Sequence, residues 1–204
     1  MAAQQVGFPV VLKVLSDEIP HRSDKGLVQV AIGDPAALAN AFAGMQQRLA
    51  GITLAAPPAY LLQPQINDAV EVFAGILVDV ELGPCVLIGT GGVLVELFND
   101  ISVRPLPLRE GDVEAMIDAT RLGALLAGFR GRPAADRAAL TDCVYRLAEL
   151  GLHWGGQIRE MDVNPILVLP AGHGCVIVDA VIFPRAQAEA PRRIAGASPS
   201  EDKQ

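Results

Sequence analysis

The chain has 204 residues, a formal net charge of −7, a hydrophobic fraction of 51% and a mean hydropathy of +0.35. These values favour one or two compact α/β lobes and exclude a largely disordered chain. An acidic chain is a poor match for nucleic acid, so no nucleic-acid partner is expected. No apolar run reaches the roughly 18 residues of a membrane span, and the N-terminus lacks the pattern of a signal peptide. We therefore expect a cytoplasmic protein with no membrane partner.

Strands and helices alternate along the chain, which is typical of an α/β fold. Short runs rich in β-branched residues predict strands, and apolar periodicity with capping residues predicts helices. Asp34 and Pro35 stand at the N-cap and first position of one helix, and Asp136 stands near the start of another. The predicted order is strand 8–15, strand 27–32, helix 36–49, strands 60–64, 70–78, 84–88 and 93–98, helices 110–126 and 134–150, and strands 160–165 and 174–180.

Three cysteines, Cys85, Cys143 and Cys175, are widely spaced and stand in apolar runs. Their spacing forms no metal-binding pattern, and their number is odd. Both features indicate reduced core residues of a cytoplasmic protein.

Three oxygen-bearing side chains near the end of the chain form a candidate metal site. Asp162 and Asn164 are two residues apart on a predicted strand, so both side chains should leave it on the same face. Pro165 follows, which predicts a sheet edge or a bulge. Asp179 interrupts the next apolar strand, where a carboxylate needs a partner or a metal. Such ligands suit Mg²⁺, although carboxylates hydrogen-bonded to nearby amides would give the same pattern.

Cations and polar residues in the first half of the chain suggest a phosphate site. Lys13 interrupts an apolar strand, where it must reach solvent or an anion, and His21 opens a polar loop that also carries Arg22 and Lys25. Glu71 and Glu96 stand within predicted apolar strands, where each can bind a hydroxyl or a cation, and Gln63 and Glu71 lie where they would border a nucleotide cleft. A solvated loop and a lysine that reaches water at a strand end are the plainer alternatives.

Taken together, these residues resemble a known family. The run from Gly7 to Lys13, followed by His21-Arg22-Ser23-Asp24 and Gly26, is similar to the opening of the ATP-grasp domain of ADP-forming acyl-CoA synthetases. The resemblance continues, in order and at similar spacing, over residues 5 to 183. Its further motifs are Leu62-Gln63-Pro64, Glu71, Gly83-Pro84, Gly89-Thr90-Gly91-Gly92, Glu96, Gly128 to Pro133, Asp162-Val163-Asn164-Pro165 and Asp179.

The resemblance implies a role for each matching residue. Lys13 would contact the nucleotide phosphates, and Gln63 and Glu71 would border the adenine and ribose. Mg²⁺ would be held by Asn164 and Asp179, with Asp162 beside them. His21 matches a histidine that carries phosphate near the nucleotide, and that would make it the catalytic residue of a phosphohistidine relay. The implied cofactors are ATP or ADP and Mg²⁺, and the implied partner is a CoA-binding acyl-CoA synthetase subunit or domain.

The resemblance also predicts the domain organisation and the differences that matter. We expect a two-lobe ATP-grasp fold with an incomplete N-terminal small lobe at 1–58, a large lobe with the nucleotide and Mg²⁺ site at 59–184, and a disordered tail at 185–204. The family has a further helix and strand before the position of Gly7. It also has Lys where this chain has Arg22, and Gly where this chain has Leu27, a change that can stiffen or block the loop that carries His21.

Two functions of different classes follow from these residues. The first is an acid–thiol ligase of the ADP-forming acetate–CoA type, which needs its partner subunit for activity. The alternative is a truncated, non-catalytic ATP-grasp module that binds nucleotide or a partner protein. A different ATP-grasp ligase that uses an acyl phosphate would leave the His21 loop without a special role. The acyl substrate and the physiological direction are not specified by the sequence.

Overall fold

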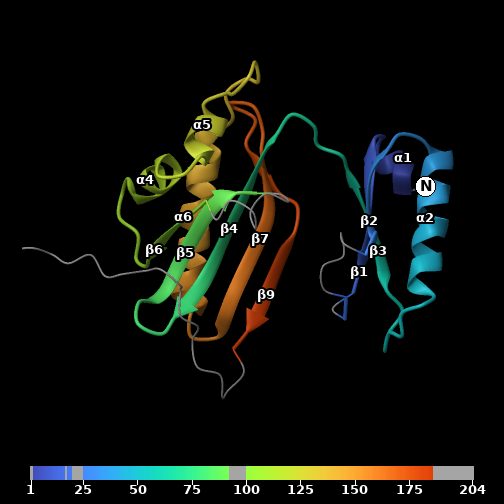
Figure 1. Ribbon diagram of the computed structural model, residues 1–204, viewed down its shortest axis with the longest axis horizontal. Coiled ribbons are helices and arrows are strands. Elements are labelled where there is room, and N and C mark those ends of the chain that lie inside the picture. Colours follow the sequence, from blue (N-terminus) through green and yellow to red (C-terminus); the bar gives the residue numbers. More distant parts are fainter. Residues whose placement is uncertain (1, 17, 20–24, 92–99, 186–204) are drawn as a thin grey trace, which may run out of the picture. The chain divides into compact units, whose positions relative to one another are not determined.

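The computed structural model describes residues 2–16, 18–19, 25–91 and 100–185, and these fall into two compact units, Met1–Asn67 and Asp68–Gln204 (Figure 1). The division after Asn67 differs from the predicted boundary after residue 58, because the strand at Ala59–Pro64 pairs along its full length with a strand of the first unit. The predicted strand at 93–98, the His21 loop and most of the predicted tail lie outside the described residues. No described helix is long and apolar enough to cross a membrane.

The first unit is a three-stranded antiparallel sheet with a helix on one face. The sheet order is β2-β1-β3, and the elements are α1 (Ala2–Val6), β1 (Val10–Leu15), β2 (Val28–Ile32), α2 (Pro35–Leu49) and β3 (Ala59–Pro64). Helix α2 starts as predicted, because Asp34 accepts a 2.8 Å hydrogen bond from the Ala37 amide and Pro35 needs no partner for a missing N–H. Met45 and Leu49 of α2 pack in a cluster with alternate residues of β1.

The second unit is a six-stranded antiparallel sheet covered on one face by helices (Figure 1). Its order is β6-β5-β4-β7, and both β8 and β9 pair with β7. The elements are β4 (Val70–Asp79), β5 (Gly83–Thr90), β6 (Ile101–Pro105), α4 (Asp112–Asp118), α5 (Leu122–Leu126), α6 (Arg137–Trp154), β7 (Ile158–Val168), β8 (Cys175–Ile177) and β9 (Ala180–Pro184).

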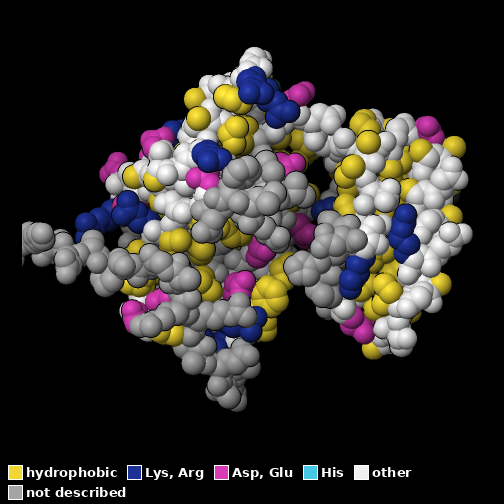
Figure 2. All heavy atoms as spheres, viewed as in Figure 1, with side chains coloured by type: hydrophobic (Ala, Val, Ile, Leu, Met, Phe, Trp, Pro, Cys, Tyr) yellow, Lys and Arg dark blue, Asp and Glu magenta, His cyan; other side chains and the backbone are white. Residues whose placement is uncertain are grey.

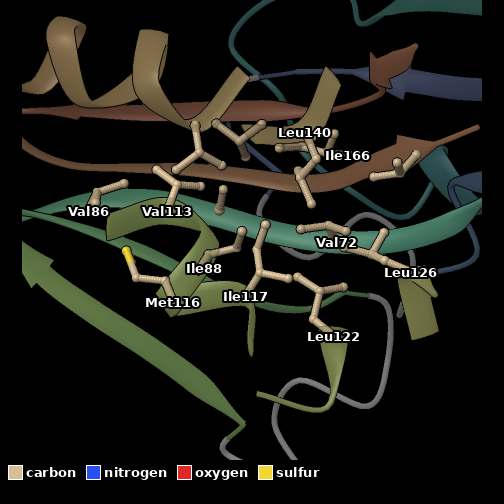
Figure 3. Packing of buried hydrophobic residues seen from close by; sticks show 14 of the residues in the cluster. Val72, Val86, Ile88, Val113, Met116, Ile117, Leu122, Leu126, Leu140 and Ile166 are labelled. Atoms are coloured by element: carbon tan, nitrogen blue, oxygen red, sulfur yellow. The ribbon is translucent and has the colours of Figure 1, made fainter. Parts of the chain in front are cut away.

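The core of the second unit lies between the sheet and helices α4, α5 and α6 (Figure 3). Alternate strand residues face the helices and are fully buried, among them Val72, Ile88 and Ile166, and Leu140 of α6 packs against them. Burial of each such side chain stabilises the fold by about 1.5–3 kcal/mol. The residues between them must point to the other side of the sheet, which we call the distal face.

Helix boundaries differ from the predictions where polar or packing contacts decide them. The predicted helix 110–126 is broken into α4 and α5, because the Thr120 hydroxyl donates to the Ile117 carbonyl and Asp100 accepts from the Arg121 amide. The helix predicted at 134–150 begins at Arg137 after the Asp136 N-cap, and it runs past Gly151 to Trp154. A Cβ at Gly151 would lie 2.8 Å from Ile76 Cδ1, so this glycine permits close packing and does not end the helix.

Two elements, α1 and β6, were not predicted, and the strand predicted at 174–180 is two strands. The predicted strand is interrupted at Val178 and Asp179, so that β8 pairs with one part of β7 and β9 pairs with another part. This break places Asp179 at the junction of the two strands instead of inside one.

Candidate functional site

Strand β7 presents Asp162 and Asn164 on the distal face, as their spacing predicted. Met161 and Val163 are buried in the helix-covered core, so the residues that alternate with them point the other way. Asp162 pairs across the sheet with Gly75 of β4. The two predicted metal ligands therefore lie side by side on one face of the second unit.

Pro165 lies at a bulge, which confirms one of the two positions predicted for it. The register between β4 and β7 shifts between the pairs Ala74–Val163 and Val72–Ile166, and Pro165 stands within that shift. Pro165 stands in the middle of the sheet, where a residue without an N–H is tolerated only because the hydrogen-bond ladder between β4 and β7 is interrupted. At this interruption β7 changes its outer partner from β9 to β8.

The strand break brings Asp179 next to Asn164. The Asn164 amide donates a 3.1 Å hydrogen bond to the Asp179 carbonyl, and the Val178 amide donates a 3.0 Å bond to the Pro165 carbonyl. Asp179 Oδ1 accepts from the following amide of Ala180 at 3.1 Å. One oxygen of Asp179 thus fits the plainer reading of a carboxylate bound to a nearby amide.

Asp162 lies in an environment that disfavours its negative charge. Burial raises the pKa of its carboxyl, and the neighbouring charges of Glu160 and Asp179 raise it further. Its Oδ1 atom is buried and has no hydrogen-bond partner among the described residues. A buried carboxylate oxygen of this kind is costly unless a cation lies against it.

The predicted set fits Mg²⁺ in its chemistry. It offers two carboxylates and one amide oxygen, and Mg²⁺ would complete its shell with waters and phosphate oxygens. No group of three or more His, Cys, Asp or Glu side chains is placed to hold a metal within the described ranges. The predicted set has only two carboxylates, and its third ligand, Asn164, is not one of these four residue types. Glu160 is an acidic neighbour whose role the sequence pattern did not reveal, although it stands two residues before Asp162.

Glu71 lies farther along the same distal face. It is exposed at the start of β4, four residues from the position that pairs with Asp162, which corresponds to about 13 Å of strand. The Gly91 amide donates a 2.8 Å hydrogen bond to its carbonyl. A Cβ at Gly91 would lie 2.7 Å from Val72 backbone atoms, so this glycine is needed for close backbone packing.

In the first unit, Lys13 and Gln63 share the sheet face turned away from α2. Val10, Leu12 and Val14 of β1 face α2, so Lys13 points to the other side. Gln63 pairs with Val11, two residues or about 7 Å along the strand from Lys13. Lys13 is only 7% exposed, and Gln63 Oε1 is buried without a hydrogen-bond partner among the described residues.

The structure therefore assembles the predicted residues as two separate sets, one in each unit. Lys13 and Gln63 belong to the first set, and Glu71, Asp162, Asn164 and Asp179 belong to the second. His21 and Arg22 lie outside the described residues. Leu27 is fully buried in the first core, and its carbonyl accepts a 3.0 Å hydrogen bond from the Val14 amide.

A pocket of about 550 Å³ lies on the helix-covered side of the second unit and contains none of the predicted site residues. It is lined by Glu114, Arg137, Ala138, Thr141, Asp142 and Tyr145. On the face shown in Figure 2, basic side chains are scattered among acidic and apolar ones, and the described residues there form no continuous basic patch.

Comparison with known proteins identifies the family. A family model described as an ATP-grasp domain matches residues 1–183. The β subunit of ADP-forming acetate–CoA ligase II from Pyrococcus furiosus is 32% identical over 89% of this chain and 77% of its own length. The ADP-forming 4-hydroxybutyrate–CoA ligase of Nitrosopumilus maritimus is 31% identical over 89% of this chain, which spans only 26% of that protein.

Solved structures give the same result. The dinucleotide-forming acetyl-CoA synthetase 1 of Ca. Korarchaeum cryptofilum, in complex with coenzyme A, Ca-AMPCP and HgCl⁺, has a TM-score of 0.82 and 37% identity. The match covers 90% of this chain and 80% of that one. A second structure of that enzyme contains Mg-AMPPCP and has its phosphohistidine segment pointing towards the nucleotide binding site. The fold and the family predicted from the motifs are confirmed: this chain belongs to the ATP-grasp family and is homologous to the ATP-grasp part of ADP-forming acyl-CoA synthetases.

Proposed function

We propose that this chain is the nucleotide-binding part of an ADP-forming acyl-CoA synthetase and acts in the cytoplasm with a CoA-binding subunit or domain. The complete reaction would be acid + CoA + ATP ⇌ acyl-CoA + ADP + phosphate. Support comes from the homology with β subunits of acetate–CoA ligases and from the phosphate- and metal-binding chemistry of the two residue sets. The acyl and CoA sites would belong to the partner.

The side chains of both sets have chemistry suited to Mg·nucleotide. Lys13 would offset phosphate charge, and the buried acceptor of Gln63 would receive a hydrogen bond from the amino group of adenine. Glu71 would accept hydrogen bonds from the ribose hydroxyls. Asp162, Asn164 and Asp179 would hold Mg²⁺, which supplies charge compensation for the phosphates when it is bound.

The observation that carries this proposal is the state of Asp162. Its Oδ1 atom is buried without a hydrogen-bond partner among the described residues, and it faces the charges of Glu160 and Asp179. An ordinary structural aspartate would have its oxygens satisfied by amides, as one oxygen of Asp179 does. A bound cation would contact the buried Oδ1 of Asp162 and would also compensate the negative charges of Glu160 and Asp179.

Binding of Mg·ADP and Mg·ATP tests the proposal directly. We expect the purified chain to bind either nucleotide below millimolar concentration with Mg²⁺ and much more weakly with EDTA, because the metal links the carboxylates to the phosphates. Isothermal titration calorimetry measures both affinities, and circular dichroism establishes that the protein is folded. A folded chain that binds no nucleotide would contradict the proposal.

His21 distinguishes the enzyme from a non-catalytic module. If it carries phosphate, incubation with Mg·[γ-³²P]ATP should label the wild-type chain with an acid-labile phosphoryl group, and His21→Ala should abolish the label. Nucleotide affinity should change less than about tenfold, or 1.4 kcal/mol, because the imidazole acts as a nucleophile and not as a nucleotide ligand. His173→Ala is a suitable control, since His173 is exposed in the turn before β8.

The alternative function is a module that binds nucleotide without phosphoryl transfer. Its specific support is Leu27, which occupies the first core where the family has glycine. A buried leucine lacks the backbone freedom that glycine would have at this position, which follows His21 in the sequence. Tight Mg·nucleotide binding by a wild-type chain that takes up no label would establish this alternative.

A further inference from the structure

Two cysteines that are far apart in the sequence lie together in the second unit. Cys143 is in the middle of α6, and Cys175 is the first residue of β8. The Cys175 thiol donates a 3.6 Å hydrogen bond to the Ala139 carbonyl. That carbonyl lies one helical turn before Cys143, and both cysteines pack against the same hydrophobic core. The two sulfurs are in hydrogen-bonding contact with each other, and both residues are free and partly buried.

The surroundings of Cys143 and Cys175 affect the ionisation of the two thiols differently. Burial raises the pKa of both. For Cys143, the hydrogen bond from Cys175 and the charge of Arg146 act in the opposite direction and favour its thiolate, while Asp142 disfavours it. For Cys175, the Cys143 thiolate, Asp136 and Asp142 all add to the effect of burial and raise its pKa to about 11. These influences favour the thiolate of Cys143 over that of Cys175.

We propose that Cys143 and Cys175 are an oxidisable dithiol that closes to an intramolecular disulfide, with Cys143 as the attacking thiolate and Cys175 as the resolving thiol. The bond would join α6 to β8, immediately ahead of Asp179. Neither residue belongs to the nucleotide or metal sets, so this inference is independent of the proposed function.

The reaction is an ordinary two-step exchange with a small disulfide RSSR as the oxidant. The Cys143 thiolate attacks one sulfur of RSSR, and a Cys143–SR mixed disulfide forms as RS⁻ leaves. Cys175 then loses its proton to the solvent and attacks Cys143 Sγ, which releases the second RS⁻. Loss of the Cys143 charge in the first step also favours ionisation of Cys175. In total, two protein thiols are oxidised and one RSSR is reduced to two RSH.

The pH dependence of the first step follows from these surroundings. Only the thiolate attacks, and the pKa of Cys143 lies above that of an ordinary cysteine. Its reaction with oxidised glutathione should therefore accelerate from pH 7 to 9 and level at a higher pH than the reaction of an ordinary exposed thiol.

Exchange with oxidised glutathione, followed by alkylation and mass spectrometry of the whole chain and its peptides, tests the proposal. The reduced wild-type chain should yield a Cys143–Cys175 cross-link without retained glutathione. Cys175→Ser should accumulate glutathione on Cys143, because no resolving thiol is present. Cys143→Ser should react at least tenfold more slowly, and Cys85→Ser should behave as wild type because Cys85 is fully buried on another strand.

Circular dichroism of each variant checks that it is folded, and the wild-type result stands by itself if a variant is not. Stable mixed disulfides on wild-type Cys143, with no cross-link at any pH, would overturn the proposal. Equal rates of glutathione addition in Cys143→Ser and Cys175→Ser would overturn the assignment of Cys143 as the attacking residue.

Discussion

Replacement of Asp162 by Asn is expected to remove the Mg²⁺ dependence of nucleotide binding and, at the same time, to stabilise the metal-free chain. The affinity for Mg·ADP should fall at least tenfold, a cost of about 1.4 kcal/mol or more, because a charged ligand is lost. The melting temperature without metal should rise, since the variant no longer buries a charge beside Glu160 and Asp179. Calorimetric titration and thermal unfolding in EDTA measure the two effects.

The gain in stability expected for Asp162→Asn depends on pH, and the sign of this dependence is definite. The folded protein holds a proton on Asp162 more tightly than the unfolded chain does, because burial raises the pKa of the carboxyl in the fold. The contribution of Asp162 to the free energy of unfolding is therefore fully present below its unfolded pKa of about 4. It is lost as the pH rises through its folded pKa. The advantage of Asp162→Asn should appear above this window and vanish below it.

Asp142→Asn is the matched control for Asp162→Asn. Asp142 lies on α6 with a side chain 64% exposed, and it forms a 2.9 Å ion pair with Arg146. Loss of an exposed pair of this kind changes stability by only about 0.2–1 kcal/mol, and Mg²⁺ affinity should not change. If Asp162→Asn keeps wild-type Mg·nucleotide affinity, Asp162 is a structural residue and the proposed metal set is wrong.

Gly75→Ala is expected to destabilise the second unit strongly. Gly75 is buried on β4, and a Cβ there would lie 2.7 Å from the Met161 carbonyl oxygen of β7. Because the obstacle is backbone, the two central strands must separate locally, at a cost of about 1–3 kcal/mol or more. Gly75 pairs with Asp162, so Mg·nucleotide affinity should fall together with the melting temperature.

Gly156→Ala provides the comparison for Gly75→Ala. No heavy atom lies within 4 Å of the Cβ that this change would add, so stability should change by less than about 0.5 kcal/mol. Thermal and urea unfolding measure both variants. Equal melting temperatures for Gly75→Ala and Gly156→Ala would show that β4 and β7 are not packed as closely as the structure has them.

Local signals in the sequence were reliable where the residues concerned interact with near neighbours. Asp34 and Asp136 act as N-caps within a turn of their own position, and α2 begins as predicted, whereas α6 begins at Arg137 and not at the predicted residue 134. Alternation along β7 predicted that Asp162 and Asn164 share a face, because side-chain direction in a strand depends only on the backbone. The family motifs were equally readable, since they are sequence patterns themselves.

Long-range packing decided the remainder. Gly151 resembles a helix end but lies inside α6, because Ile76 of β4 leaves no room for a side chain there. Ala59–Pro64 belongs to the first unit because it pairs with β1, a contact that composition around residue 58 does not encode. Leu150, at the predicted end of the helix, is exposed because α6 turns Ala148 and Gly151 toward the core instead.

The sequence by itself determined the α/β class and the ATP-grasp family, and it supplied the residues that we propose to bind Mg²⁺ and nucleotide. Only the tertiary structure decided that Asp162 is buried beside Glu160 and Asp179 and that Cys143 meets Cys175. The reason is physical: a motif specifies which chemical groups are present, whereas the pKa and reactivity of a group depend on burial and on charges brought near it by folding.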